Sequence, residues 1–398
     1  MVGQDESDYS VAIMNPGGIS GFDSGRQRIP FQWFSVTALI PGGTMFAPVH
    51  RGALADDVGI SRRTHRSTNG RRHCSRTLGV LALTFAMACL VAGLFAIGSP
   101  AEAAPSKPAA ANTGVPAGTT LTRYTGPLII SVDGTVIDRK AVYGDLKIRA
   151  KNVIVRNSYL HCGTQVPTGN TGCVDANGST VYNLLVTNNT IIPDRPSYYR
   201  DGIVGHEFTA RYNHISHTND GIGIFNRPGG SVNANVTVQG NYIHDLTHWN
   251  NDPAHRDGTH NDGIQVQGGQ NIAIRGNTIV GSVVAGDGLG VYGTHAGSAL
   301  IVNQNVAKVA NLVVDGNWLD NGQNTVSVHY DKYANVALTM SNNYFGRNQY
   351  VFGNGSKYTI RIDSRSKSKI TGLGTNRWEN NNQLLTEGRD TGIRYMAG

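Results

Sequence analysis

The sequence has few charged residues and few cysteines for its length. Only 15% of its 398 residues are Asp, Glu, Lys or Arg, and 4 are cysteine. No cysteine pair with zinc-ligand spacing and no His-Glu-x-x-His motif is present, which argues against a zinc site. No basic run interleaved with aromatic residues supports nucleic-acid binding. A long helical period is also absent, whereas 50 glycines and many Asn and Thr residues predict a β-rich chain with frequent turns.

The first hundred residues contain one long hydrophobic run. Residues 78–98 carry no charge, follow Arg71, Arg72 and Arg76, and precede the small-residue segment Ala101-Glu-Ala. This order is typical of a signal peptide, so we expect residues 78–104 to direct secretion and to be cleaved near Ala103 or Ala104. An uncleaved membrane anchor is the alternative, because 21 apolar residues can span a bilayer. Residues 1–77 show no hydrophobic period, which predicts a poorly structured extension.

Cleavage would leave a mildly basic protein. Residues 1–103 hold 9 of the 34 Lys and Arg and 7 of the 27 Asp and Glu, which leaves 25 against 20. Such a charge is compatible with an acidic substrate. Cys162 and Cys173 are the cysteines that remain, and a secreted protein permits a disulfide between them. The Pro, Ala and Gly content of residues 105–118 predicts a flexible linker.

A short phrase recurs from residue 153 onward: two alternating apolar residues, a short spacer, Asn, any residue, and another apolar residue. Its asparagines are Asn157, Asn189, Asn213, Asn241, Asn277, Asn317 and Asn343, with a degenerate eighth copy at Asn376. Asparagine tolerates the left-handed backbone of a tight turn, and its side chain can bond to the same amide one coil away. The copies therefore predict the stacked coils of a solenoid with variable insertions.

A second phrase consists of Asp, Gly and Ile or Leu. Copies begin at Asp201, Asp220, Asp262 and Asp287, with a looser copy at Asn324. In a strand, the third and fifth residues after each of these positions point to the same side. They are Val204 and His206, Gly223 and Phe225, Gln265 and Gln267, Gly290 and Tyr292, and Ser327 and His329. If the coils stack, these side chains form one continuous outer face across which a polymer can lie.

The repeats predict an all-β fold, a single-stranded right-handed parallel β-helix over residues 119–398. Each coil holds two or three short strands and cannot bury its apolar side chains alone, so stacking is required. A β-propeller is the alternative, but its blades need a regular period of about 40 to 50 residues. The intervals here run irregularly from 24 to 40 residues, which favours the β-helix.

With both repeats and the secretion signal, residues 119–377 resemble the pectate-lyase-like superfamily of right-handed parallel β-helix proteins. That resemblance implies action on acidic or neutral polysaccharides. Locally, His206-Glu207 followed by Asn219-Asp220-Gly is similar to the Asp-Pro-His-Glu segment of mannuronan epimerases. Val204 and Gly205 stand where those enzymes have the leading Asp and Pro, so an identical mechanism is not implied.

Cleavage of a uronate polymer by β-elimination needs a neutralised carboxylate, a base for the C5 proton and an acid for the leaving oxygen. We assign the base to Lys332 or His329 and the proton donor to Tyr292 or His206. Arg256, with Ca²⁺ as a possible cofactor, is assigned to the carboxylate. A solvated surface role is the alternative for the two histidines and for the lysine.

The insertion 248–262 predicts a wall beside the outer face, because it is too long for a tight turn and carries three histidines, Trp249 and Arg256. The predicted substrate-binding residues are Phe225, Trp249, Gln265, Gln267 and His260. A polar surface loop is the alternative for this segment. The remaining strand-end histidines are assigned to turns and packing.

The repeated aspartates allow two interpretations. On adjacent coils, like charges about 5 Å apart raise a pKa unless a cation intervenes, which makes Asp220, Asp262 and Asp287 candidate calcium ligands. Alternatively, each carboxylate accepts backbone N–H groups at the turn that starts its strand. Both interpretations stay open at this point.

The favoured function is a secreted polysaccharide lyase that acts by β-elimination on a uronate-containing polymer. A glycoside hydrolase with two carboxyl groups, a C5-epimerase and a non-catalytic carbohydrate-binding protein are the alternatives. The expected partner is an extracellular, acidic polysaccharide, and the expected state is a monomer that neither binds nucleic acid nor, after cleavage, a membrane.

Overall fold

The computed structural model describes residues 106–163, 167–286, 297–329, 332–333, 336–388 and 390–397. The chain divides into two units, Met1–Leu90 and Val91–Gly398, and the second unit contains all of these residues. The expected extension and signal peptide lie outside the described residues. In the part of the chain that is described, no helix is both long enough and apolar enough to cross a membrane.

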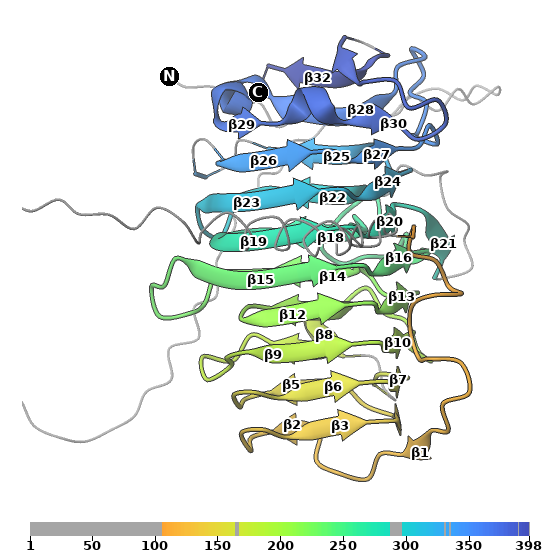
Figure 1. Cartoon of the computed structure of the whole chain (residues 1–398), viewed down its shortest axis with the longest axis vertical. Helices are drawn as coiled ribbons and strands as arrows, with labels where there is room; N and C mark the ends of the chain where they lie inside the picture. The colour runs from red at the N-terminus through yellow and green to blue at the C-terminus, as the bar shows by residue number, and fades with distance from the viewer. Residues whose placement is uncertain are drawn as a thin grey trace, which may run out of the picture. The chain divides into compact units, whose positions relative to one another are not determined.

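Three parallel sheets run along the second unit (Figure 1). Sheet A contains β1 (Thr122–Arg123), β4 (Lys140–Val142), β7 (Tyr159–Leu160), β10 (Thr190–Ile191), β13 (His214–Ser216), β16 (Tyr242–His244), β20 (Thr278–Val280), β24 (Trp318–Asp320), β27 (Tyr344–Phe345) and β30 (Arg377–Trp378). Sheet B contains β2 (Ile129–Ile130), β5 (Leu146–Ile148), β8 (Thr171–Ala176), β11 (Arg200–Gly205), β14 (Ile222–Ile224), β18 (Ile264–Val266), β22 (Ser298–Val302), β25 (Asn324–Val328), β28 (Tyr358–Asp363), β32 (Gly392–Met396) and β31 (Thr386–Glu387). Sheet C contains β3 (Val136–Asp138), β6 (Ile154–Arg156), β9 (Leu184–Thr187), β12 (Phe208–Arg211), β15 (Asn233–Gln239), β19 (Gly269–Arg275), β23 (Val309–Asp315), β26 (Leu338–Ser341) and β29 (Ile370–Thr371).

The chain visits the sheets in a repeating order, B then C then A, as in β8, β9 and β10 followed by β11, β12 and β13. Each coil thus adds one strand to each sheet, and the predicted parallel β-helix is confirmed. A small extra sheet of β17 (Leu246–His248) and β21 (Val283–Ala285) lies outside the three sheets. Two short 3₁₀ helices, η1 (Ser364–Lys369) and η2 (Leu373–Thr375), belong to the last coils.

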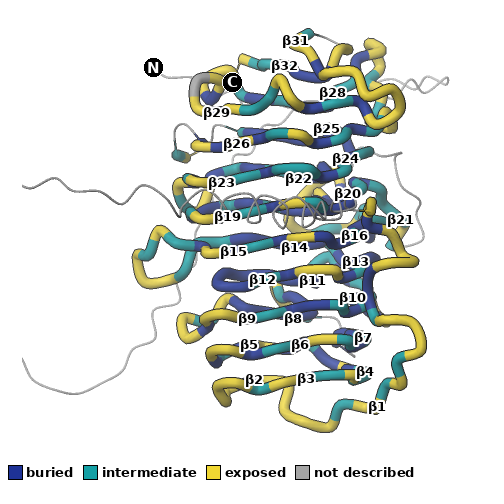
Figure 2. Tube along the Cα trace, viewed as in Figure 1, coloured by how far each residue is buried: buried dark blue, intermediate teal, exposed yellow. Residues whose placement is uncertain are grey.

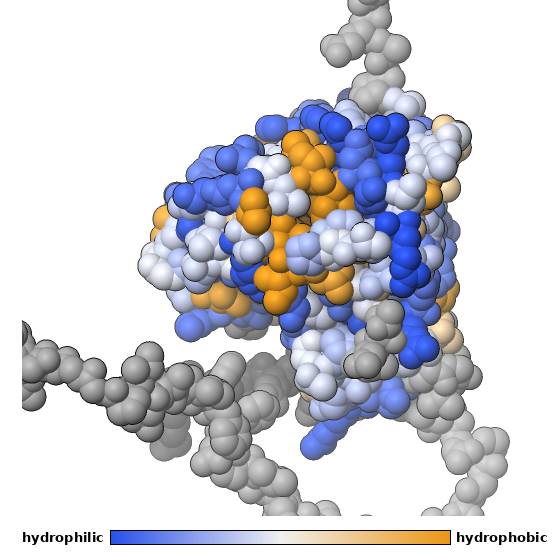
Figure 3. All heavy atoms as spheres, turned by 90° about the horizontal axis from the view of Figure 1, so that it is seen from below, coloured by the Kyte–Doolittle hydropathy of each residue, from blue (hydrophilic) through white to orange (hydrophobic). Residues whose placement is uncertain are grey.

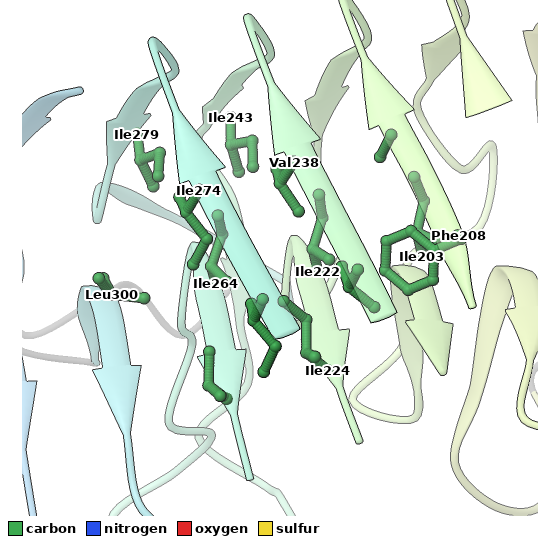
Figure 4. Close-up of a cluster of buried hydrophobic side chains, with 14 of the residues drawn as sticks. Ile203, Phe208, Ile222, Ile224, Val238, Ile243, Ile264, Ile274, Ile279 and Leu300 are labelled. Carbon is green, nitrogen blue, oxygen red and sulfur yellow. The ribbon is translucent and has the colours of Figure 1, made fainter. Parts of the chain in front are cut away.

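The core is a set of aliphatic side chains stacked from coil to coil. In sheet B, Ile203 pairs with Ile222, which pairs with Ile264, which pairs with Leu300, and all four are fully buried. Figure 4 shows these residues in line, pointing into the space between the sheets. Buried and exposed positions alternate along many strands in Figure 2, as a two-residue period requires. Each buried Ile contributes about 1.5 to 3 kcal/mol, and only stacking provides that burial.

A buried ladder of asparagines closes the turn between sheets C and A. Its rungs are Asn189, Asn213, Asn241, Asn277, Asn317, Asn343 and Asn376. Each amide Nδ2 donates to the Oδ1 of the next rung, at 2.8 to 3.1 Å. The eighth copy at Asn376 is therefore a true rung.

The structure corrects two details of this ladder. The residue in register with Asn189 is Ser158, not Asn157, because Arg156 pairs with Thr187. The left-handed backbone falls on the residue before each rung from Asn189 to Asn343, for example Asn188 at φ 56° and Gly240 at φ 65°. The sequence pattern predicts both the left-handed backbone and the amide hydrogen bond at one asparagine. In the structure these two roles belong to two neighbouring residues.

A second, exposed ladder follows the turn between sheets B and C, and the sequence analysis missed it. Asn271 Nδ2 donates to Asn235 Oδ1 at 3.1 Å, and Asn235 Nδ2 donates to Glu207 Oε1 at 2.9 Å. These residues are in the left-handed region, with φ between 51° and 62°. Glu207 thus occupies a place that asparagine holds in the next coils.

The segment before the first coil contacts the solenoid. The N–H of Gly114 donates to the Tyr212 carbonyl at 2.9 Å, and the N–H of Val115 donates to Thr190 Oγ1 at 3.1 Å. Lys107 forms an ion pair with Glu379 of a late coil. Residues 106–118 are therefore a strap along sheet A (Figure 1), which differs from the expected flexible linker.

The first coil leaves apolar side chains at the end of the solenoid. Figure 3 looks at this end from below and shows apolar side chains gathered on it. Ile129, Val132 and Val136 are 59%, 68% and 51% exposed.

The predicted disulfide between Cys162 and Cys173 is present in an early coil.

Candidate functional site

The outer face of sheet B carries two parallel rows of side chains. Strand register defines the first row as Lys147, Asp175, Val204, Gly223, Gln265, Ile301, Ser327, Arg361 and Arg394. The second row, two residues further along each coil, contains His206, Phe225, Gln267, Asn303, His329 and Asp363. Successive coils are about 4.8 Å apart, so the side chains of each row follow one another at this spacing along the solenoid.

The predicted pairs at β11, β14, β18 and β25 occupy these two rows, but the fourth copy of the Asp-Gly phrase is misplaced. Ser298 of β22, not Asp287, follows Asp262 in the ladder, because the Ser298 N–H donates to Asp262 Oδ1 at 2.9 Å. Ile301 and Asn303 therefore take the places that Gly290 and Tyr292 were expected to hold. Asp287 and Tyr292 lie outside the described residues.

The aspartates of the phrase cap backbone groups of the next coil. Asp201 Oδ1 accepts the Asp220 N–H at 3.1 Å, and Asp220 Oδ1 accepts the Asp262 N–H at 2.9 Å. Asp220 and Asp262 are 6% and 2% exposed. Burial raises the pKa of Asp201 and of Asp262 to about 7, and burial with the neighbouring Asp charges raises the pKa of Asp220 well above its ordinary value. The three carboxyl groups have the structural role that the sequence left as an alternative.

Calcium binding by Asp220, Asp262 and Asp287 stays a prediction, since Asp287 is not described. The carboxyl oxygens of the first two that accept backbone N–H groups lie within the coil, which does not favour a metal at the surface. Within the described residues, the group with three close potential ligands is Asp145, Cys162 and Cys173. Its cysteines form the disulfide, and Asp145 pairs with the buried Arg200 at 3.0 Å.

His206 is in the second row but is not an exposed floor residue. It is 1% exposed, and burial, followed by the charge of Arg227, lowers its pKa. Arg227 stacks on Tyr182 at 3.5 Å and lies 3.7 Å from the Glu207 carboxylate. The sequence predicted an exposed imidazole that donates a proton, whereas His206 is buried. Its side chain cannot reach a polymer lying on this face without rearrangement.

The middle of the face is neutral and polar. Gln267 Nε2 donates to Gln265 Oε1 at 2.6 Å, and both side chains are half-buried. Phe225, one coil earlier in the second row, is also half-buried and lies over Gly223. A Cβ at position 223 would approach this ring to 3.2 Å, so the glycine makes room for Phe225. These three predicted substrate-binding residues are brought together.

The next described catalytic candidate on this face is His329. Its Nε2 lies 2.8 Å from Ser327 Oγ and 3.5 Å from Arg361 Nη1. Because an arginine has only donors, the nitrogen facing Arg361 is an acceptor, which places the lone pair of a neutral imidazole there. Ser327 is buried, whereas His329 and Arg361 are half-buried. Arg361 was missed because it belongs to no repeated phrase; only its strand register with Ser327 identifies it.

The insertion after β17 is held at its base and exposed at its tip. The Trp249 N–H donates to Thr259 Oγ1 at 2.9 Å, and the Trp249 ring meets Tyr198 edge to face at 6.0 Å. Arg256 and His260 are exposed, and His260 pairs with Asp257 at 3.2 Å. The half-buried Trp249 is thus partly engaged by the protein itself, and the loop assignments stay predictions.

Lys332 is exposed and lies 5.5 Å from the ring of Tyr333. None of its contacts with the described residues places it in the two rows of sheet B. His329 is therefore the better positioned of the two predicted bases.

Comparisons with known proteins add a fold likeness. No family model and no curated protein sequence matches the chain. Among solved structures, the chain is similar to the A-module of the mannuronan C-5 epimerase AlgE6 of Azotobacter vinelandii, with a TM-score of 0.40 and 13% sequence identity. The alignment covers 66% of this chain and 63% of that module, so less than two thirds of either is matched. At this TM-score and identity, the likeness supports no conclusion about the chemistry of this chain.

Proposed function

We propose that this protein is a secreted polysaccharide lyase that acts by β-elimination on a uronate-containing polymer. The observation that carries the proposal is the acceptor nitrogen of His329 on the outer face of sheet B, next to the guanidinium of Arg361 on the following coil. The β-helix supplies a long, regular face for a polymer, and the neutral middle of the face supplies amides that bond to hydroxyl groups.

The assigned roles follow from the chemistry of the reaction. His329 Nε2 takes the C5 proton, because it is an acceptor nitrogen of the outer face and its 3.5 Å contact with Arg361 is long enough for the substrate to replace it. Arg361 stabilises the negative charge that develops on the uronate carboxylate as that proton leaves. Ser327 holds the imidazole in position through its 2.8 Å hydrogen bond. Tyr292 remains the proposed donor to the leaving oxygen, and Arg256 a further contact to the polymer.

A glycoside hydrolase is less well supported by the same face. Hydrolysis by the usual route needs two carboxyl groups facing the scissile bond. In the two described rows the carboxyl groups are Asp175 and Asp363, and each already pairs with an arginine, Arg149 at 3.2 Å and Arg365 at 2.7 Å. Asp201, Asp220 and Asp262, the described aspartates of the Asp-Gly phrase, accept backbone N–H groups of the next coil.

The experiment is incubation of the purified protein with pectate, alginate and glucuronan. We expect ultraviolet absorbance from unsaturated uronate products to rise with one of these polymers. New reducing ends without that absorbance would indicate hydrolysis. Deuterium at C5 after reaction in D₂O, without chain cleavage, would indicate the epimerase, which shares the proton-abstraction step. Binding without any product would reject all three enzymes.

Calcium dependence is tested in the same assay. Activity lost with a chelator and restored by added Ca²⁺ would support the predicted calcium requirement, and unchanged activity would reject it.

A further inference from the structure

The basic side chains of sheet B differ between its two ends. In the early coils, the arginines on or beside the outer face have acidic partners: Arg149 pairs with Asp175 at 3.2 Å, and Arg227 lies 3.7 Å from Glu207. In the late coils, Arg361 and Arg394 form no ion pair with any carboxylate of the described residues. Lys147, the basic residue of this row in the early coils, lies opposite Asp175 in the strand register, whereas Arg361 and Arg394 lie opposite each other. Positive charge without an acidic neighbour in register therefore concentrates on β28 and β32.

Arg361 and Arg394 are direct neighbours across two coils. They are paired in the strand register and occupy the same outer row. Like charges placed opposite each other on neighbouring strands destabilise a sheet unless an anion lies between them. Both side chains are half-buried, so solvent screens this repulsion less than on an open surface.

Arg394 also has a nitrogen without a hydrogen-bond partner. Its Nη1 is buried and unpaired, while its guanidinium lies 4.9 Å from the ring of Tyr358. Leaving a buried N–H of a charged group unpaired is costly, and a shift of the guanidinium that brings this N–H to a bound acceptor removes that cost. The ring contact limits the positions that the guanidinium can adopt, which favours a defined ligand position.

Asp363 of β28 and Glu387 of β31 already have cationic partners. Asp363, in the second row of β28, is held by Arg365 through Oδ1 at 2.9 Å and Oδ2 at 2.7 Å. The charge of Arg361 contributes to lowering the pKa of Asp363, but the two groups form no ion pair. Glu387 pairs with Lys367 at 3.1 Å. An anion from outside the chain is therefore the fitting partner.

We propose that Arg361 and Arg394 form a carboxylate subsite that selects acidic over neutral polysaccharide and fixes the bound polymer on the late coils of sheet B. This inference rests on the proposed function, because it takes the ligand to be a uronate polymer. A carboxylate is the fitting anion, since guanidinium groups bind its two oxygens through parallel hydrogen bonds. Arg361 adjoins His329, whereas Arg394 lies one coil further away, so Arg394 acts on binding and not on proton transfer.

The test is calorimetric binding of pectate, alginate and glucuronan oligosaccharides and of their carboxyl-reduced, neutral counterparts. Arg394→Gln and Arg361→Gln should each weaken binding of the acidic oligosaccharide about tenfold, as expected for one charge-assisted contact that remains partly solvated. Arg211→Gln removes an exposed arginine from sheet C and should leave binding unchanged. Arg394→Lys should retain part of the affinity because it keeps the charge.

Three results would overturn the subsite. Binding by Arg394→Gln as tight as by the unmodified protein, wild-type binding of the neutral oligosaccharides as tight as of the acidic ones, or no binding of any acidic oligosaccharide would each do so. Unfolding midpoints of the variants show whether they are folded. The lyase proposal fails separately: arginine-dependent binding without unsaturated product keeps the subsite and rejects the lyase. In an active enzyme, Arg394→Gln should raise KM and leave kcat unchanged, a split that a purely structural role would not produce.

Discussion

The buried aspartates of the Asp-Gly phrase predict that the β-helix loses stability as the pH rises. Asp262 is 2% exposed, and burial raises its pKa from 3.8 to about 7. Between these two values the folded protein keeps a proton that the unfolded chain releases. The contribution to stability is therefore fully present below about pH 4 and is lost as the pH rises to about 7, after which it stays constant.

The magnitude is large for a single side chain. A pKa that rises from 3.8 to about 7 corresponds to about 4 kcal/mol between the two ends of this range, and Asp201 and Asp220 act in the same direction. Asp262→Asn keeps an oxygen that accepts the Ser298 N–H but cannot ionise. In this variant, the unfolding free energy should vary with pH by up to about 4 kcal/mol less than in the wild type. At pH 8 the variant should be more stable than the wild type.

The assay is urea unfolding of the wild type and of Asp262→Asn at pH 5 and pH 8, with free energies compared by linear extrapolation. About 3 of the 4 kcal/mol fall between these two pH values, because pH 5 lies two units below the folded pKa. Asp257→Asn is the matched control, because it makes the same change in charge on the exposed insertion. A wild type that is as stable at pH 8 as at pH 5 would refute the reasoning. So would an Asp262→Asn variant that is destabilised equally at both pH values, since its role would then be hydrogen bonding alone.

Three further predictions concern the coils and their covalent link. Asn241→Ala should destabilise the protein by about 3 to 5 kcal/mol in urea unfolding, because Asn241 is fully buried and its loss leaves the Asn213 and Asn277 amides without a rung. Asn271→Ala, in the exposed ladder, should cost only about 1 to 2 kcal/mol, mainly through its left-handed backbone, and an equal loss in both variants would contradict this ranking. Removing the disulfide with Cys162→Ser and Cys173→Ser should cost about 3 kcal/mol for a loop with a sequence separation of 11, and an unchanged unfolding midpoint would contradict it.

Much of the fold was predictable because each coil repeats one local solution. Asparagine at one turn recurs in the coils from Asn189 to Asn376, and inward apolar residues recur on the strands, so errors in one copy are corrected by the others. The fourth Asp-Gly copy failed for a physical reason: Ser298 supplies the N–H that caps Asp262, and a backbone N–H is present at every residue except proline. A sequence pattern made of side-chain types therefore does not identify which residue donates its backbone N–H to the Asp262 carboxylate.

The site was only partly predictable, because outward direction does not determine exposure. His206 and His329 both occupy the second row, yet His206 is covered beside Phe225 and Arg227, whereas His329 is half-buried. Arg361 and Arg394 come from coils whose sequences do not show the Asp-Gly phrase, so only the pairing of β25, β28 and β32 places Arg361 beside His329 and Arg394 one coil further away. The exposure of the two histidines and the positions of the two arginines are set by packing between coils, which depends on insertions of different length.

The central claim is that His329 removes the C5 proton of a uronate on the outer face of sheet B. The most direct measurement is the initial rate of unsaturated product formation by His329→Ala, with Lys332→Ala and the wild type measured on the same polymer. We predict at least a hundredfold loss of kcat for His329→Ala, as for removal of a general base, with Lys332→Ala near the wild-type rate. Full activity of His329→Ala, or a comparable loss in Lys332→Ala alone, would contradict the assignment.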